Sequence, residues 1–183
     1  AEWALGEVIE RLAPLDPTYL KLPAYSIDDD EAAFDAAATL TRALAEKAKD
    51  ENTRLLAENA PGTMCDTGYD CDAFLDAVGY PDTVFFSFNP AHFARIGSKP
   101  FLQTFRHSDC SRRMAQLMIT DGCAGPWPPY TRPGRGQGEV KELISILRCR
   151  SFDGLFTIAP TRPQDPDRFD QCARDFWRLL HNC

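Results

Sequence analysis

The chain has 183 residues, of which 44% are hydrophobic, and its formal net charge is −7. This size and composition predict a single globular domain, residues 1–183, with a core of its own. The acidic balance argues against a nucleic-acid partner, which needs a basic face, and no apolar run approaches the roughly 20 residues of a membrane span.

The first 60 residues predict a helical layer without cysteine. Residues 2–13 carry apolar side chains at the i, i+3, i+4, i+7 spacing of one helical face. A longer helix is expected at about 31–58, with Asp28 and Glu31 in a capping-box pattern at its start. The stretch 18–27 between these helices is expected to be a connector.

From residue 61 onward the predicted elements become short and alternate in type. The expected order is helix 71–78, strand 83–88, helix 91–96, helix 110–119, an irregular stretch 121–138, helix 139–148, strand 154–159 and helix 166–181. Interleaved strands and helices predict a helix-rich α/β fold, with a small central sheet, a helical N-terminal layer (1–60) and a cysteine-containing α/β core (61–183).

Seven cysteines in a chain of this length, without a Cys-x-x-Cys pair, predict disulfides and an oxidising compartment. They lie at positions 65, 71, 110, 123, 149, 172 and 183. We expect local bridges Cys110–Cys123 and Cys172–Cys183, an unpaired cysteine, and a secreted protein whose signal has been removed. The alternative is a cytosolic protein in which the thiols are buried as small hydrophobes.

A glycine-rich segment precedes the helix expected at 139–148. Gly136 and Gly138 allow backbone N–H groups to approach a ligand closely, and Arg132 and Arg135 can pair with a phosphate. The segment matches neither the Rossmann nor the P-loop fingerprint. It is therefore either an anion-binding loop or a flexible surface loop.

Glu139 is the carboxylate of most interest, because it lies where this loop enters a helix, near Trp127 and Tyr130 in the sequence. A glutamate beside aromatic rings can hold a cationic sugar or pyridinium group by charge and stacking. The alternative role is stabilisation of the helix start by its negative charge.

Neither a metal nor a cofactor is expected. His107, Cys110 and Cys123 match no common zinc spacing. A catalytic cysteine is a further alternative: Cys71 at a helix start, followed by His92, resembles a compressed form of the NlpC/P60 cysteine peptidases, in which a helix N-terminus lowers the pKa of the nucleophilic thiol.

Three stretches resemble the ADP-ribosyl cyclase and NAD glycohydrolase family: 70–78, 84–99 and 140–172. The resemblance implies cleavage of the nicotinamide–ribose bond of a nucleotide substrate, with Glu139 as the catalytic carboxylate. The substrate-binding residues expected for this activity are Trp127, Tyr130, Arg132, Arg135, Gly136 and Gly138, of which Trp127 stands in for the family's aromatic residues. The acidic segment that the family has after its first strand–helix unit is missing from 101–107.

The leading hypothesis is therefore a secreted NAD-cleaving enzyme with a small-molecule nucleotide substrate. The alternative is a non-catalytic secreted effector or inhibitor that binds another protein through the irregular 121–138 loop, because aromatic residues such as Trp127 and Tyr130 often anchor interfaces.

Overall fold

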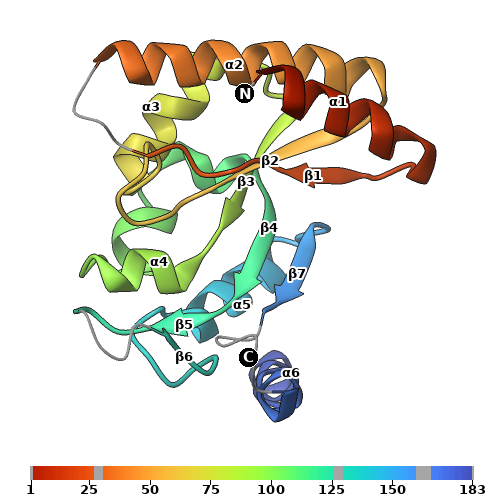
Figure 1. Ribbon diagram of the computed structural model, residues 1–183. Coiled ribbons are helices and arrows are strands. Elements are labelled where there is room, and N and C mark those ends of the chain that lie inside the picture. Colours follow the sequence, from red (N-terminus) through yellow and green to blue (C-terminus); the bar gives the residue numbers. More distant parts are fainter. Residues whose placement is uncertain (1, 27–30, 126–129, 160–165, 183) are drawn as a thin grey trace.

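Five parallel strands form a curved sheet at the centre of the protein (Figure 1). The computed structural model describes residues 2–26, 31–125, 130–159 and 166–182. The strand order is β1-β2-β3-β4-β7, and all four pairings are parallel. These strands are β1 (Tyr19–Lys21), β2 (Arg54–Glu58), β3 (Val84–Phe88), β4 (Met114–Ile119) and β7 (Leu155–Ile158). Two short strands, β5 (Asp121–Gly122) and β6 (Tyr130–Thr131), form an antiparallel pair just after β4.

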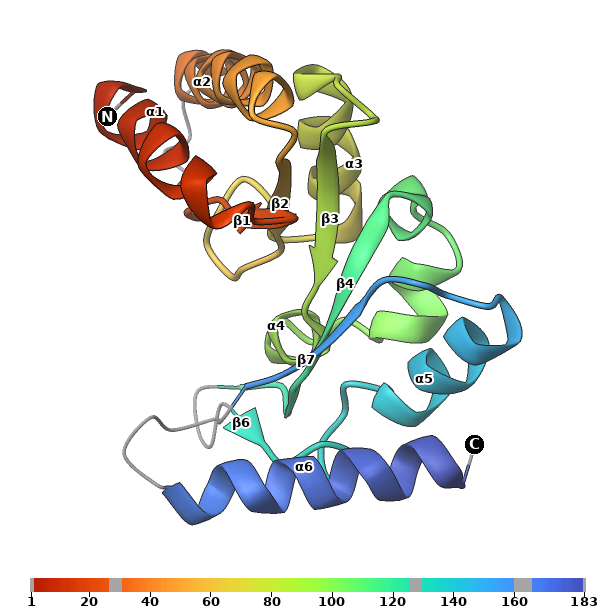
Figure 2. The same cartoon turned by 90° about the vertical axis from the view of Figure 1, so that its right-hand side faces the viewer.

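Most of the helices follow the outer side of the curved sheet, and one short helix, α4 (Pro90–Arg95), lies at the carboxyl end of β3 (Figure 2). They are α1 (Glu2–Leu12), α2 (Glu31–Asp50), α3 (Gly68–Val78), α4 (Pro90–Arg95), α5 (Val140–Cys149) and α6 (Pro166–His181). Short 3-10 helices, η1 (Ala13–Leu15) and η3 (Asp109–Arg112), and one π-helix, η2 (Pro100–Phe105), complete the connections. Parallel neighbours require a crossover, and helices supply it. The predicted α/β class is confirmed.

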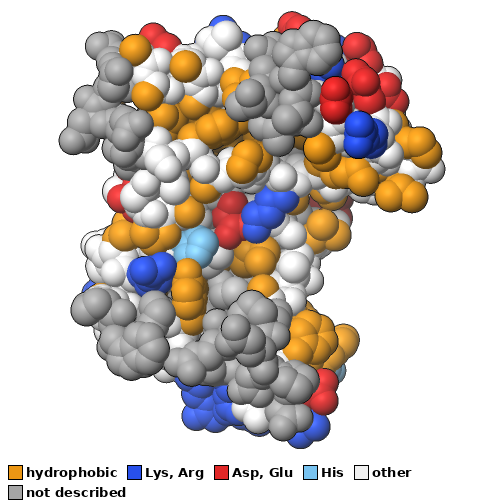
Figure 3. Space-filling model, viewed as in Figure 1, with side chains coloured by type: hydrophobic (Ala, Val, Ile, Leu, Met, Phe, Trp, Pro, Cys, Tyr) orange, Lys and Arg blue, Asp and Glu red, His pale blue; other side chains and the backbone are white. Residues whose placement is uncertain are grey.

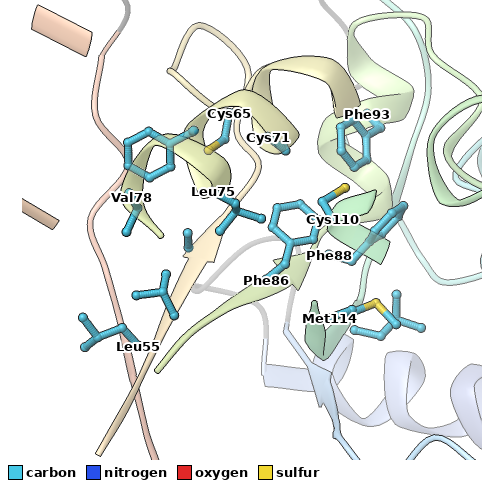
Figure 4. Packing of buried hydrophobic residues seen from close by; sticks show 14 of the residues in the cluster. Leu55, Cys65, Cys71, Leu75, Val78, Phe86, Phe88, Phe93, Cys110 and Met114 are labelled. Carbon is cyan, nitrogen blue, oxygen red and sulfur yellow. The ribbon is translucent and has the colours of Figure 1, made fainter. Parts of the chain in front are cut away.

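The core lies between the sheet and the helices (Figure 4). Every second residue of a strand faces it, as Leu55 and Ala57 do on β2 and Phe86 on β3, because side chains alternate between the faces of a strand. Leu44 of α2 and Phe74 of α3 meet them from the helical side. The residues between these strand positions face the concave side of the sheet.

The helix predicted at 31–58 is wrong in its last third. Helix α2 ends at Asp50, because Asn52 takes a left-handed conformation with φ 53° and the Thr53 N–H bonds the Ala48 carbonyl at 2.8 Å. The residues that follow are strand β2. The connector predicted at 18–27 contains the three-residue strand β1. Residues 1–60 therefore supply two strands of the sheet as well as helices.

The helix predicted at 110–119 is also wrong. The Asp72 carboxylate accepts the backbone N–H groups of Asp109 and Cys110, which fixes the short helix η3, and β4 follows. All six residues of β4 are buried, and β3 and β7 flank it on its two sides. A strand of this kind has no polar alternation, so its apolar residues also fit a helical stripe.

The remaining predicted elements lie close to the observed ones: β3, α4, α5, β7 and α6 match the ranges expected from sequence. Helix α3 starts at Gly68, with Thr67 as N-cap and Asp70 as its capping-box partner. Asp28, expected to cap the helix at 31, lies outside the described residues. The division into domains stays a prediction.

The disulfide prediction is not supported. Cys110 and Cys123 are both free thiols, so the bridge expected between them is wrong, and Cys183 lies outside the described residues. Cys65, Cys71 and Cys110 are buried side by side in the core (Figure 4), where they pack as small hydrophobes. The described structure contains no disulfide that stabilises the fold. Secretion stays a prediction, but the disulfides on which it rested are not found among the described cysteines.

None of the helices within the described ranges is both long and apolar enough to span a lipid bilayer.

Phe86→Ala should lower the free energy of unfolding by about 3–5 kcal/mol, because the ring is fully buried between the sheet and the helices. Phe169→Ala is the matched control, since that ring is 47% exposed, and it should cost less than about 0.5 kcal/mol. Urea unfolding followed by circular dichroism measures both, and equal losses would contradict the placement of β3 in the core.

Candidate functional site

One polar side chain from each strand of the sheet forms a continuous row on its concave face. This polar row consists of Lys21, Glu58, Ser87, Gln116 and Thr157, from β1, β2, β3, β4 and β7. Lys21 Nζ forms an ion pair with Glu58 Oε2. Ser87 Oγ lies 3.4 Å from the same carboxylate oxygen and donates to Gln116 Oε1 at 2.6 Å. Gln116 Nε2 donates to Thr157 Oγ1 at 2.7 Å.

The row follows from the register of the sheet. Glu58 is paired with Ser87, and Ser87 with Gln116, so their side chains point to the same face. Glu58 is the last residue of β2, and Lys21 is the last of β1. The row therefore reaches the carboxyl ends of the strands, which is where parallel α/β sheets and barrels carry their ligands.

A second set of contacts joins the ends of β2, β3 and β4. The Asn59 side chain bonds both backbone groups of Asn89, accepting its N–H at 2.7 Å and donating to its carbonyl at 3.0 Å. Asn89 Nδ2 donates to Glu58 Oε1 at 2.7 Å, and Thr120 Oγ1 donates to Asn89 Oδ1 at 2.6 Å. The Glu58 carboxylate is thus held at both oxygens, by Asn89 on one and Lys21 on the other.

His92 lies beside this carboxylate in a hydrogen-bond chain of fixed direction. Its Nδ1 is 2.6 Å from the Asn59 carbonyl, which can only accept, so Nδ1 carries the proton. Nε2 then accepts from the Tyr130 hydroxyl at 3.0 Å, and Arg95 Nη1 donates to that hydroxyl at 3.1 Å. Burial lowers the pKa of His92, so the ring is neutral near pH 7.

Acidic, basic and histidine side chains gather where the outline of the molecule narrows (Figure 3). His92 Nδ1 is 3.6 Å from Glu58 Oε1, which brings the histidine and the carboxylate into one site. Tyr130 and Arg95 border this site from β6 and α4, with the Arg95 guanidinium 5.2 Å from the centre of the Tyr130 ring. The site combines a fixed carboxylate, an ammonium group, a neutral imidazole and several hydroxyl and amide groups.

The glycine-rich loop binds a carboxylate of the protein itself. Gly136 N–H donates to Asp121 Oδ2 at 2.9 Å and Gly138 N–H to Asp121 Oδ1 at 2.7 Å, while Gly122 adds a third N–H at 2.8 Å. Burial raises the pKa of Asp121, and these N–H donors oppose that rise. Of the two alternatives left open by the sequence, an anion-binding loop or a flexible surface loop, the loop has the backbone contacts of the first, but the group that it binds is the protein's own Asp121.

Glu139 has a structural role in a different place. Its Oε2 accepts the N–H groups of Phe101 at 2.8 Å and Leu102 at 3.2 Å, at the start of η2. It also borders a surface cavity of about 330 Å³, together with Lys99 and Gln137. Glu139 is not part of the polar row, and its predicted catalytic role belonged to the NAD-cleaving reaction.

The other predicted binding residues do not form one site. Arg132 ties the loop to α6, with its Nε 3.0 Å from Asp175 Oδ2 and its Nη1 donating to Gln171 at 2.9 Å. Arg135 is exposed, and Trp127 lies outside the described residues. Of the predicted set, the structure brings Tyr130 to the polar site.

The cysteine peptidase alternative is wrong. Burial raises the pKa of the Cys71 thiol well above its usual value, and hydrogen bonds with Cys110 and Cys65 raise it further. Both ring nitrogens of His92 are engaged, by Asn59 and Tyr130. A buried thiol without an available imidazole is not an activated nucleophile.

Solved structures match this fold along nearly the whole chain. A xylose isomerase domain protein from Planctomyces limnophilus is 14% identical, with a TM-score of 0.77 over 99% of this chain and 63% of its own. The probable 3-DHS dehydratase AsbF of Bacillus anthracis is 16% identical, with a TM-score of 0.77 over 93% of this chain and 69% of its own. The IolI protein, solved with a zinc atom, is 14% identical, with a TM-score of 0.78 over 98% and 68%. The fold is therefore xylose isomerase-like, and the chain spans 63% to 69% of the length of these proteins.

No protein family model matches the sequence, and no curated protein sequence is significantly similar to it. The fold overturns the resemblance to the ADP-ribosyl cyclase family. That resemblance rested on the order of a few helices and strands, such as 70–78 followed by 84–99. The same order arises in any repeated strand–helix unit. Neither the NAD-cleaving enzyme nor the secreted effector or inhibitor finds support in these neighbours.

The sequence analysis named none of the main residues of this site: Lys21, Glu58, Ser87, Asn89, Gln116 and Thr157. Two of them lie on strands that were predicted as helix, and Lys21 lies in a predicted connector. One signal was present in the sequence: a mostly apolar run followed by Asn occurs twice, at Asn59 and Asn89, which are 30 residues apart. That interval fits one strand–helix unit of a parallel sheet.

Acid should destabilise the wild-type protein more than His92→Gln. The pKa of His92 is lowered from 6.5, so as the pH falls through about 6.5 the unfolded chain takes up a proton before the folded one does. The free energy of unfolding must then fall until the pH reaches the folded pKa. Urea unfolding at about pH 7.5 and 5.5 measures this, and an equal loss in the variant would show that His92 is not buried and neutral.

Gly136→Ala should destabilise the loop, because a Cβ there would lie 2.4 Å from the Gly122 carbonyl oxygen and 2.5 Å from Asp121 Oδ1. We expect a loss of about 1–3 kcal/mol in thermal or urea unfolding. Arg135→Ala, one residue away and exposed, should change stability by less than about 0.5 kcal/mol. A silent Gly136→Ala would contradict the close contact between the loop and Asp121.

Proposed function

We propose that this chain binds a small polyhydroxylated carbonyl compound of the sugar class on the concave face of its sheet and exchanges a proton next to the carbonyl group, as isomerases and epimerases do. The observation that carries the proposal is the polar row, in which Glu58 is fixed at the carboxyl end of β2. The activity is proposed for the chain as it stands, although it spans only part of its structural neighbours.

The neighbours support this substrate class. They include a D-tagatose 3-epimerase-like protein, a D-allulose 3-epimerase from Methylomonas sp. and a 3-keto-D-glucoside 4-epimerase from E. coli. Each is a sugar epimerase or a protein like one. At 15% to 17% identity these proteins share the fold, and the chemistry must be argued from the residues present here.

The polar row suits a ligand with many hydroxyl groups. A hydroxyl both donates and accepts, and so do the Ser87 hydroxyl and the amides of Asn89 and Gln116. A neutral sugar also avoids repulsion from a protein with a net charge of −7.

Glu58 is suited to move a proton at carbon. Removing a proton next to a carbonyl needs a base held in place. The same group can return that proton on its own face to the neighbouring carbon, which gives the isomer, whereas epimerisation needs a second proton donor on the opposite face of the sugar. Asn89 and Lys21 fix both carboxylate oxygens, and Lys21 favours the ionised form that can accept a proton. The neutral His92 and the Tyr130 hydroxyl lie beside it, where they can orient a sugar hydroxyl.

Zinc, which the IolI structure contains, does not fit the residues at this site. The parts of the chain that the structure describes contain no group of three or more His, Cys, Asp or Glu residues that could hold a metal ion. Glu58 is paired with an ammonium group, and the two nitrogens of His92 are bonded to Asn59 and Tyr130. No step of the proposed reaction passes through a metal.

The test is deuterium exchange from D2O into D-tagatose and D-allulose, followed by proton NMR. Wild-type protein should wash out the hydrogen next to the carbonyl group, and Glu58→Gln should slow this about 10²–10⁴-fold, because the amide cannot act as the base. Glu10→Gln is the matched control, since Glu10 forms a surface ion pair with Lys47 at 3.2 Å and should leave the exchange rate unchanged.

Two outcomes would remove the proposal. One is the absence of both binding and exchange with every ketose in the panel. The other is exchange that survives Glu58→Gln at the wild-type rate, which would place the chemistry elsewhere. Binding without exchange would leave a sugar-binding protein and exclude the proton transfer.

A further inference from the structure

The cation beside the Glu58 carboxylate in this structure is the Lys21 ammonium. Its Nζ contacts Glu58 Oε2, and Asn89 Nδ2 takes Oε1. A divalent cation at this carboxylate would have to displace one of these donors and would be repelled by the ammonium charge.

The other groups around the carboxylate are also poor ligands for zinc. Ser87 and Gln116 present a hydroxyl and an amide. Zinc in proteins is bound mainly by thiolate, imidazole and carboxylate groups. The only imidazole within ion-pair range of Glu58 in the described structure is that of His92, which is fixed as a neutral ring by Asn59 and Tyr130.

Lys21 is placed to contact a ligand directly. Its side chain is 43% exposed, whereas the Glu58 side chain is only 11% exposed, so the ammonium is the more accessible of the two charged groups. An ammonium group has three N–H donors, and the contact with Oε2 uses one of them. The Leu22 N–H bonds the Leu56 carbonyl at 2.9 Å, which fixes the end of β1 and with it the position of Lys21.

We propose that Lys21 Nζ, and not a metal ion, is the cation that this site offers to the carbonyl or hydroxyl oxygens of its ligand. The inference rests on the proposed sugar-class function of the same site. When a base removes a proton next to a carbonyl group, negative charge develops on the oxygen, and a fixed positive group within hydrogen-bond range stabilises it. Lys21 supplies that charge, and Glu58 holds it in place.

The charge state of Lys21 is set by two opposing effects. Burial lowers the pKa of this lysine, since taking an ammonium group out of water is costly. The adjacent Glu58 carboxylate favours the charged form. The ion pair therefore keeps a partly buried lysine protonated.

The first arm of the test uses metal alone. Chelator-treated wild-type protein is titrated with Mn²⁺ and with Zn²⁺ in a calorimeter, and we expect no stoichiometric binding at about 10 µM metal that depends on Glu58. Metal bound by surface thiols such as Cys149 would be equal in wild type and Glu58→Gln. A single metal site that Glu58→Gln abolishes would overturn the inference, whether or not a sugar binds.

The second arm measures D-tagatose and D-allulose binding in the presence of EDTA. Lys21→Met should weaken binding about tenfold or more, and Lys21→Arg should retain part of it, because a cation remains. Lys47→Met is the matched control, since Lys47 forms the surface ion pair with Glu10, and it should have no effect. Circular dichroism shows that each variant is folded.

The outcomes separate this inference from the proposed function. Sugar binding that requires added metal, or that is unchanged in Lys21→Met, would overturn the role of Lys21 and leave the proposed function standing. Absence of sugar binding under every condition would overturn both. EDTA-resistant binding that is lost in Lys21→Met and kept in Lys47→Met would support both.

Discussion

The site depends on the charge of a nearly buried carboxylate, that of Glu58. A carboxylate that is 11% exposed has lost most of its hydration, and leaving it without a partner would cost several kcal/mol. Lys21 and Asn89 compensate it from the two neighbouring strands. Strand β1 has only three residues, and its pairing with β2 sets Lys21 opposite Leu56, on the same face as Glu58. A shift of β1 by one residue would turn the ammonium group away and leave the charge uncompensated.

A chain of hydrogen bonds that starts at the Glu58 carboxylate fixes the neighbouring side chains in place. Asn89 bonds Glu58 through its side chain and Asn59 through its backbone, and the Asn59 carbonyl fixes the tautomer of His92. The Tyr130 hydroxyl then donates its hydrogen to Nε2 of His92. A buried network of this kind is stable only when its members are satisfied together, so it holds the site rigid before a ligand arrives. The main contribution of the network is to fix the positions of the site's side chains, and the strength of any one hydrogen bond matters less.

Sequence patterns identified the elements that have a clear boundary or a clear polar face. Helix α5 has strong amphipathic spacing, and α3 has a capping box with Thr67 and Asp70. The strands β2 and β4 were missed because apolar strands buried on both faces resemble helical stripes, and the end of α2 depends on one left-handed residue, Asn52. Because Glu58 and Gln116 lie on those two strands, this part of the candidate site was missed together with them.

The chemistry of a segment was easier to predict than its partner. The glycine loop does bind a carboxylate through backbone N–H groups, but that carboxylate is Asp121, fifteen residues before Gly136 in the sequence. Glu139 does stabilise a helix start, but through the backbone of Phe101 and Leu102 at η2. The local sequence indicates what kind of partner a segment can bind, and the tertiary fold determines which partner lies within reach.

A shared fold fixes where side chains lie, and the residue types at those positions decide the chemistry. A metal centre needs three or more ligands converging on one point, whereas an ammonium group needs one carboxylate to hold it. In a curved sheet with one polar side chain per strand, a metal centre is lost when amides and hydroxyls stand in place of imidazole and carboxylate groups. An ammonium–carboxylate pair needs only two of these positions and is kept. The polar row has that composition: one carboxylate, one ammonium group and three neutral polar groups. A neutral, hydroxyl-rich ligand matches such a row, since each of its hydroxyls can both donate to and accept from the groups it meets.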